Sequence, residues 1–69
     1  MNRIPVESSN IMSIGYDQVT QTLEVEFHKG RIYQYFDVPQ AVYEEFICAG
    51  SKGAYLATQI KGYYRYARV

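Results

Sequence analysis

Hydrophobic and polar residues alternate through the middle of the chain, with the period of two that is typical of a β-strand with one wet face. The clearest run covers residues 22–27, where three apolar side chains alternate with two glutamates (Leu-Glu-Val-Glu-Phe). A second run, residues 31–37, is rich in aromatic and β-branched side chains, and Gly30 separates the two. Together the runs predict a β-hairpin around which the rest of the chain is organised.

The turn of this hairpin decides which face each strand residue occupies. A two-residue turn at Lys29 and Gly30 would hold Lys29 at a positive φ, which is unfavourable for a residue with a Cβ. A three-residue loop places His28 and Lys29 in a type I turn and leaves Gly30 alone in the left-handed position. The sequence therefore favours the three-residue loop.

This register assigns the two tyrosines of the second strand to the core face. It pairs Val25 with Tyr33 across the hairpin, and Tyr35 follows on the same face. Gln34 then faces solvent beside Glu24. A slip of one residue would turn both tyrosines outward, where they would resemble the aromatic pair that stacks bases on an RNA-recognition sheet.

Residues 10–17 form a further strand, which carries Met12, Ile14 and Tyr16 on one face. A polar turn over residues 17–21 connects it to the hairpin. Residues 1–8 read as a loose lead-in that contains Pro5. The expected sheet is a three-stranded antiparallel meander, because consecutive strands usually pair.

After Val38 and Pro39 the spacing of apolar residues changes from the period of two of a strand to that of a helix. Proline is well tolerated in the first turn of a helix, and Asp37 is near enough to cap that helix. Gly50 ends it. An apolar stripe at helical spacing faces inward, formed by Val42, Tyr43, Phe46 and Ile47.

Ser51 caps a second helix that runs to about Ile60, with Tyr55 and Leu56 also facing inward. Gly62 ends this helix, and residues 63–69 follow as a short tail, extended or loosely docked. The expected architecture is an α+β domain: a three-stranded antiparallel meander followed by two short helices packed on one face, with a short C-terminal tail. Residues 1–69 thus form a single domain.

Composition restricts the classes of function. The chain has 69 residues, which is near the lower size limit for independent folding and leaves no room for a cleft between domains. The single cysteine, Cys48, excludes an internal disulfide and suits a cytoplasmic location. No stretch approaches the length of a membrane span, so no membrane association is expected.

The order of short motifs along the chain resembles the KTSC domain family. The matching segments include Gly15-Tyr16-Asp17, Gly30, the Tyr33-x-Tyr35 pair, Val38-Pro39, Ser51-x-Gly53-x-Tyr55, Ile60-Lys61-Gly62 and Tyr64-x-Tyr66. Ala57 departs from the pattern, where a polar asparagine is expected in many relatives. The resemblance implies a small bacterial α+β module of unestablished function, found alone or at the C-terminus of some lysyl-tRNA synthetases. That attachment suggests RNA binding by analogy.

Cations and aromatic rings interleave at the C-terminal end of the chain, where residues 50–69 contain no acid. Cations neutralise phosphates, and aromatic rings stack on unpaired bases of any sequence. The candidate RNA-binding residues are Lys52, Lys61, Tyr63, Tyr64, Arg65, Tyr66 and Arg68. The alternative is that the tyrosines pack on the sheet and the arginines only solvate an edge.

Other residues give weaker signals of chemistry. His28 is expected at the tip of the hairpin and Cys48 away from the apolar stripe of its helix, so neither has an activating neighbour. One histidine and one cysteine do not supply the ligands of a structural zinc site. Ser51-Lys52-Gly53 is better explained as a helix cap than as a phosphate-binding loop.

The sequence therefore predicts a non-enzymatic cytoplasmic binding module without a metal or cofactor. Its favoured partner is RNA or a ribonucleoprotein. The alternative is a protein-interaction or homodimerisation domain that uses an exposed sheet edge, at the first or third strand of the meander.

Overall fold

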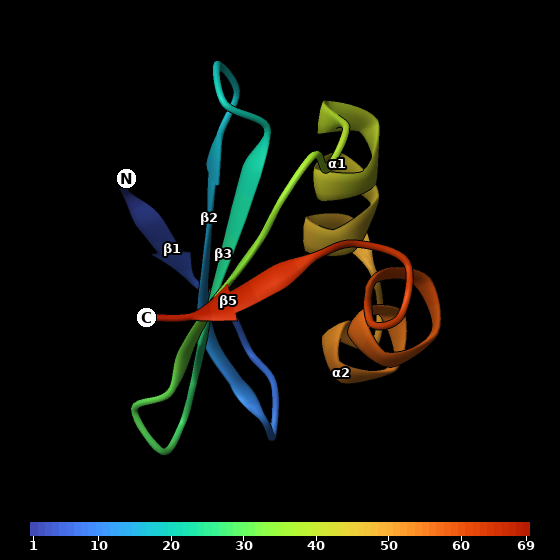
Figure 1. The fold of residues 1–69 in the computed structure, drawn as a ribbon. Helices are drawn as coiled ribbons and strands as arrows, with labels where there is room; N and C mark the ends of the chain where they lie inside the picture. The colour runs from blue at the N-terminus through green and yellow to red at the C-terminus, as the bar shows by residue number, and fades with distance from the viewer.

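The computed structural model describes residues 1–69 and contains an antiparallel sheet covered on one face by helices (Figure 1). The sheet has five strands in the order β1-β2-β3-β4-β5, so each strand pairs with its neighbour in the sequence. The strands are β1 Arg3–Pro5, β2 Ile11–Asp17, β3 Thr22–Phe27, β4 Ile32–Tyr35 and β5 Tyr66–Arg68. The helical layer contains α1 Gln40–Cys48, α2 Lys52–Tyr55 and the π-helical turn η1 Leu56–Ile60. The α+β class is confirmed, whereas the three-stranded sheet was wrong by two strands.

The β3–β4 hairpin has the predicted register. Val25 lies opposite Tyr33, and Leu23 lies opposite Tyr35. Gly30 has a φ of 84°, and its N–H donates to the carbonyl oxygen of Phe27 at 2.9 Å. The left-handed glycine therefore sets the loop length, and the loop length sets the faces of the strand residues.

Strand β1 replaces part of the expected loose lead-in. The guanidinium of Arg3 donates to Ser13 Oγ at 3.0 Å and to the carboxylate of Glu24. It also lies 3.6 Å from Glu26 Oε1. These contacts and the strand pairing fix three N-terminal residues against β2, because Arg3 pairs with the two glutamates that the sequence had assigned to solvent.

The outer face of the sheet is consequently less exposed to solvent than predicted. Glu24 is only 8% exposed, and Gln34 is half-buried beside it. Gln34 Nε2 donates to Glu24 Oε1 at 2.9 Å. The pairing of these two residues was predicted correctly, but their exposure to solvent was wrong, because Arg3 binds Glu24 and β5 pairs alongside Gln34.

The tail that the sequence predicted as extended or loosely docked is extended, and it forms strand β5. The N–H of Phe36 donates to the carbonyl oxygen of Arg65, and the N–H of Val69 donates to that of Ile32, both at 2.9 Å. Tyr66 thereby lies opposite Tyr35 at the edge of the sheet. The tail returns across the sheet after the helical layer (Figure 1).

One strand residue was assigned to the wrong face. The pairing of β2 with β3 is irregular between Ile11 and Ser13, as in a β-bulge. The additional residue, Met12, is 42% exposed, whereas Ile11 is fully buried. Met12 therefore does not join Ile14 in the core, although the alternating pattern predicted that it would.

The helical layer follows the predicted segments, but the second helix is α-helical only over Lys52–Tyr55 and continues to Ile60 as the π-helical turn η1, and the first cap differs. Ser51 caps α2 by accepting a hydrogen bond from the N–H of Ala54 at 3.2 Å, as predicted. Pro39 occupies the N-cap of α1 without a side-chain bond, while Asp37 has a φ of 58° and pairs with Arg65 instead. The role of Asp37 as a cap was wrong for this reason.

The core lies between the sheet and the helices. Phe46 is buried, and the other members of the predicted stripe pack against the core as half-buried residues. The core residues are Ile11, Ile14, Leu23, Val25, Tyr35, Val38, Phe46, Leu56 and Ile60.

Candidate functional site

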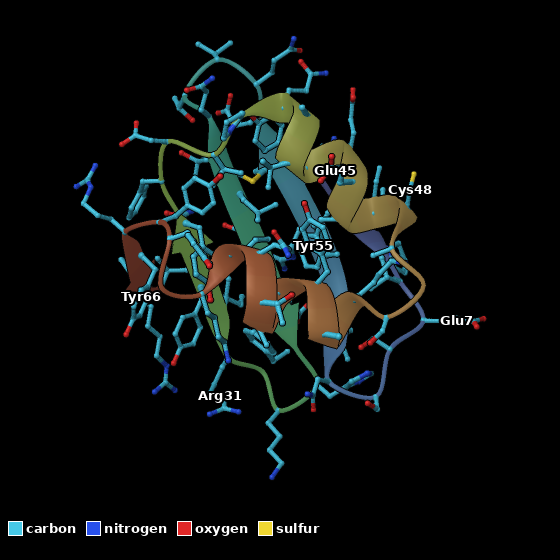
Figure 2. All side chains as sticks on the ribbon, turned by 90° about the vertical axis from the view of Figure 1, so that its right-hand side faces the viewer. Glu7, Arg31, Glu45, Cys48, Tyr55 and Tyr66 are labelled. Atoms are coloured by element: carbon cyan, nitrogen blue, oxygen red, sulfur yellow. The ribbon has the colours of Figure 1, made fainter.

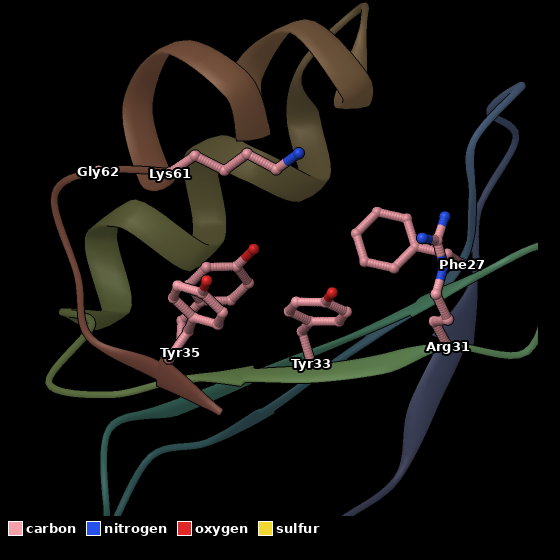
Figure 3. Close-up of a pocket in the computed structure, with 7 residues that line it drawn as sticks. Phe27, Arg31, Tyr33, Tyr35, Lys61 and Gly62 are labelled. Carbon is pink, nitrogen blue, oxygen red and sulfur yellow. The ribbon is translucent and has the colours of Figure 1, made fainter. Parts of the chain in front are cut away.

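A pocket of about 430 Å³ opens between the sheet and the end of the helical layer. Strands β3, β4 and β5 supply its floor, and the chain just after η1 forms its opposite wall (Figure 3). The lining residues are Phe27, Arg31, Tyr33, Tyr35, Lys61, Gly62 and Tyr66. The set combines four aromatic rings with two cations and contains no carboxylate.

The aromatic floor follows from the period of the three strands. Inward-facing positions of adjacent strands lie side by side, so their rings meet. Tyr33 contacts Phe27 edge to face at a centroid separation of 5.7 Å, and it stacks on Tyr66 at 5.6 Å. Tyr66 also lies 5.8 Å from Tyr35. The four rings therefore form one continuous surface, of which Tyr66 is the most exposed member at 62%.

The tyrosine hydroxyls of this floor are free of protein partners. Tyr33, Tyr35 and Tyr66 form no side-chain hydrogen bond, in contrast to Tyr16 and Tyr55. Figure 3 shows the hydroxyls of Tyr33 and Tyr35 directed toward the helical side of the pocket. Burial raises the pKa of Tyr35, and the neighbouring Tyr33 and Tyr66 raise it further. Its hydroxyl is therefore protonated at neutral pH and available as a donor.

The cations around the pocket likewise have no ion-pair or hydrogen-bond partner in the protein. Lys61 extends over the aromatic floor from the helical side, and Arg31 rises beside Phe27 (Figure 3). Arg68 lies opposite Tyr33 in the register of β5 with β4, so it belongs to the same face of the sheet. None of these three side chains takes part in an ion pair or a hydrogen bond within the protein.

Three of the other four cations of the chain have a partner within the protein. Arg3 bonds Ser13 and Glu24, Lys52 Nζ donates to the carbonyl oxygen of Ala49 at 2.9 Å, and Arg65 pairs with Asp37 at 3.1 Å. Only Lys29, at the tip of the hairpin, shares the unpaired state of the pocket cations. Three of the four unpaired cations thus surround a single aromatic pocket, although the net charge of the chain is zero.

The structure brings together some of the residues that the sequence grouped and separates others. Lys61 and Tyr66 line the pocket, and Arg68 is adjacent to it. The guanidinium of Arg65 lies 5.7 Å from the ring of Phe36, which alternates with Tyr35 and so belongs to the opposite face. Lys52 begins α2, at the other end of the helical segment from Lys61.

Two further candidates lie next to the pocket. Tyr63 is 72% exposed, and Tyr64 is half-buried against the core. Both line a shallow groove with Gly62, Arg65 and Tyr66, two of which also line the pocket. The groove therefore continues from the pocket along the segment that leads into β5.

Arg31 and Phe27 line the pocket but were not predicted as site residues from the sequence. Phe27 and the tyrosines of β4 were assigned to the core, which is correct for Tyr35 but leaves Tyr33 half-buried. The predicted register could have identified them. It places Phe27, Tyr33 and Arg31 near the turn of the hairpin, where the side chains are no longer fully buried.

The remaining candidates do not gather into a site. His28 Nε2 lies 2.8 Å from the carbonyl oxygen of Ser8, and Cys48 is exposed on α1. In Figure 2, Cys48 lies on the side of the molecule away from Tyr66 and Arg31. No group of three or more His, Cys, Asp or Glu side chains is placed to hold a metal ion. No helix has the length and apolar character needed to cross a membrane.

The sheet edges differ from those expected. The strands that the sequence placed first and third, β2 and β4, are inner strands, because β1 and β5 pair with them. The exposed edges are therefore two strands of three residues each, and β1 ends in Pro5, which has no N–H to offer a partner.

Comparison with known proteins identifies relatives over nearly the whole chain. A family model described as the KTSC domain matches residues 7–66. A lysine–tRNA ligase of Nostoc sp. is 46% identical over 63 residues, and that of Trichormus variabilis is 44% identical over the same length. These matches cover 91% of this chain but 11% of each ligase, so the chain spans about a tenth of the length of these relatives.

Two further similarities extend over entire chains. An uncharacterised protein of Stutzerimonas stutzeri is 40% identical over 70 residues, which cover 99% of that protein. The crystal structure of a KTSC domain protein from Yersinia pestis superimposes with a TM-score of 0.93 at 40% identity, covering 99% of this chain and 96% of that one.

Proposed function

The chain belongs to the KTSC domain family, and from this premise we propose that it is a non-enzymatic, cytoplasmic module that binds single-stranded RNA or a ribonucleoprotein. The observation that carries the proposal is the gathering of the unpaired cations Arg31, Lys61 and Arg68 around a floor of aromatic rings, of which Tyr66 is exposed. Nearly the whole chain is similar to one segment of lysine–tRNA ligases, and this similarity supports an RNA partner by analogy.

The chemistry of the pocket face suits unpaired nucleotides. Phosphates gain from the cations because these have no competing partner in the protein, and bases gain from stacking on rings such as Tyr66. Stacking contributes about 1–3 kcal/mol per base without selecting a sequence. The adjoining groove, with Tyr63, extends the surface beyond one nucleotide.

The opposite face of the sheet is unsuited to this role. Its central polar group is Glu24, whose charge is matched by Arg3 rather than left open to a partner. Its exposed cation, Arg65, is paired with Asp37. Of the residues that the sequence grouped, Lys61, Tyr63, Tyr66 and Arg68 therefore carry the proposal, with Tyr64 behind them. Arg65 lines the adjoining groove but is paired with Asp37, and Lys52 lies outside the contact.

Titration with a mixed single-stranded RNA tests the proposal. Intrinsic fluorescence reports tyrosines because the chain contains no tryptophan, and Tyr33, Tyr35 and Tyr66 of its eight tyrosines line the pocket. Binding through three cations predicts a slope of log affinity against log salt of roughly −2, at about −0.7 for each neutralised phosphate of a single strand. A flat titration at low salt would refute RNA binding.

Charge reversal locates the surface. Lys61→Glu with Arg68→Glu is expected to abolish RNA binding, whereas Lys29→Glu with Lys52→Glu, which changes the charge by the same amount outside the pocket and the groove, is expected to weaken it only slightly. The rival function, self-association or protein binding through β1 or β5, predicts a complex that is insensitive to salt and to Lys61→Glu. Sedimentation of the free chain distinguishes the two.

A further inference from the structure

We propose that the pocket under Lys61 is a discrete site for one phosphorylated nucleoside, with the base on the aromatic floor and the phosphate between Lys61 and Arg31. The ligand is taken either free or as a terminal nucleotide of an RNA strand. This inference rests on the proposed function and goes beyond it, because general RNA binding requires only a surface and not a saturable site for a single nucleotide.

The size and shape of the pocket suit a ligand of this class. Its volume of about 430 Å³ falls within the range of roughly 300–1,000 Å³ that is usual for small-molecule sites. It is bounded on two sides, by the sheet and by the segment at Lys61 and Gly62 (Figure 3). A flat ring system can therefore enter and be covered, which the open groove beside Tyr63 does not allow.

The charge of the pocket selects an anion. Lys61 and Arg31 both line it, Arg68 flanks it, and no carboxylate is among the lining residues. Two acids outside the pocket are already paired: Glu45 accepts from Tyr55, and Asp37 pairs with Arg65. A cationic ligand would meet uncompensated repulsion, whereas a phosphate would meet unpaired donors from opposite walls.

The tyrosine hydroxyls of the pocket further restrict the class of ligand that fits it. The hydroxyls of Tyr33, Tyr35 and Tyr66 have no partner in the protein, so a purely apolar ligand would leave them and the two cations without hydrogen bonds. An inorganic anion would satisfy the cations but leave the aromatic floor uncovered. A nucleoside phosphate supplies a flat face for the rings, acceptor atoms for the hydroxyls and a dianion for the cations.

Heteronuclear NMR titration of the full chain tests this assignment with nucleoside 5′-monophosphates, the matching nucleosides and inorganic phosphate as separate probes. We expect saturable shifts of the amide resonances of Lys61, Gly62, Tyr33 and Tyr66 with the monophosphates. The nucleosides and inorganic phosphate are each expected to bind at least tenfold more weakly. Equal affinity for inorganic phosphate, or shifts centred outside these residues, would overturn the proposal.

Lys29 offers a matched control for the cations. Lys61→Gln and Arg31→Gln are each expected to weaken monophosphate binding at least fivefold, and Lys61→Arg is expected to retain it. Lys29→Gln removes an equally unpaired charge two residues from Arg31 but outside the pocket, and should change the affinity less than twofold. Similar losses in all three glutamine variants would indicate unspecific attraction and contradict the site.

The source of the nucleotide is decided by competition. A short RNA that displaces the monophosphate from the pocket identifies a strand terminus as the ligand, and its 5′-phosphorylated and 3′-phosphorylated forms show which end enters. If RNA binds and shifts the pocket resonances but the monophosphates do not bind, this inference fails and the proposed function stands. If monophosphate binds but RNA does not, the proposed function fails. If neither binds, both fail.

Discussion

The ring of Tyr66 lies 5.6 Å from the ring of Tyr33, with 24° between the two planes. This contact joins the last strand of the chain to the central hairpin, and it also forms the floor of the aromatic pocket. One side chain therefore holds β5 in place and offers the most exposed ring of the proposed site. The structural role and the binding role of Tyr66 can be separated by experiment.

Replacement of Tyr66 is expected to loosen β5 in proportion to the lost stacking. Tyr66→Ala should lower the free energy of unfolding by about 1 kcal/mol, which is the usual contribution of an aromatic pair. Tyr66→Phe keeps the ring and should be neutral. The measurement is urea denaturation together with amide exchange at Phe36 and Val69, whose N–H groups bond across the β4–β5 edge. Unchanged exchange in Tyr66→Ala would show that stacking does not hold the strand.

The central hairpin could be predicted from sequence because its information is local. The left-handed conformation at Gly30 follows from the turn chemistry of three adjacent residues, and the turn determines that Tyr33 and Tyr35 face inward. The cap at Ser51 and the helical stripe around Phe46 follow in the same way from short spacings.

The outer strands could not be predicted because their partners are distant in the sequence. Arg3 is held by Glu24, which is 21 residues away, and Arg65 reaches Asp37 across 28 residues. A three-residue strand carries too little periodicity to be recognised on its own. The candidate site was found only in part for the same reason: it combines Lys61 and Tyr66 with Arg31 and Tyr33, which β5 brings together.

Gly15 allows β1 to lie close against β2. A Cβ at this position would come within 2.8 Å of Arg3 Cγ and 2.9 Å of the backbone oxygen of Asn2. Gly15→Ala should therefore displace β1 and lower the free energy of unfolding by about 1–3 kcal/mol, as overpacking usually does. Gly50→Ala is the control, because nothing lies within 4 Å of the added carbon. Thermal denaturation of the two variants compares them, and equal stability would contradict the close approach.

Glu24 is expected to make the stability of the fold sensitive to acid. Burial raises the pKa of this carboxyl, but hydrogen bonds from Gln34 and Arg3 and the charge of Arg3 outweigh burial and hold the pKa below its ordinary value of 4.5. A folded-state pKa below the unfolded value gives stability that is present above pH 4.5 and is lost as the pH falls through the folded-state pKa.

Glu24→Gln should remove this acid dependence and lower the free energy of unfolding at pH 7 by about 1.5–3 kcal/mol, the usual contribution of a hydrogen bond to a charged group. Glu44→Gln provides the control, since Glu44 is exposed and accepts only from Gln40. Denaturation curves at pH 3 to 7 give the measurement. An unchanged acid transition in Glu24→Gln would place its origin in another carboxylate.

The hydroxyl of Tyr55 is expected to ionise at a higher pH than that of an ordinary tyrosine. Its hydroxyl donates to Glu45 Oε1 at 2.9 Å (Figure 2). Its ring stacks on Phe46 at a centroid separation of 5.5 Å. Burial, the hydrogen bond to Glu45 and the charge of Glu45 raise the pKa of Tyr55 to about 12 from 10.0. Because the neutral phenol is favoured in the folded state, its contribution to stability is present below pH 10 and is lost as the pH rises toward 12.

The ring resonances of Tyr55, followed by NMR against pH, give the measurement. Glu45→Gln should move the Tyr55 midpoint back toward 10, because it removes the carboxylate that opposes formation of the phenolate. Glu44→Gln changes the same charge one residue away, on a side chain that contacts Gln40 rather than Tyr55, and should leave the midpoint in place. A midpoint near 10 in the unsubstituted chain would show that the bond between Tyr55 and Glu45 does not persist in solution.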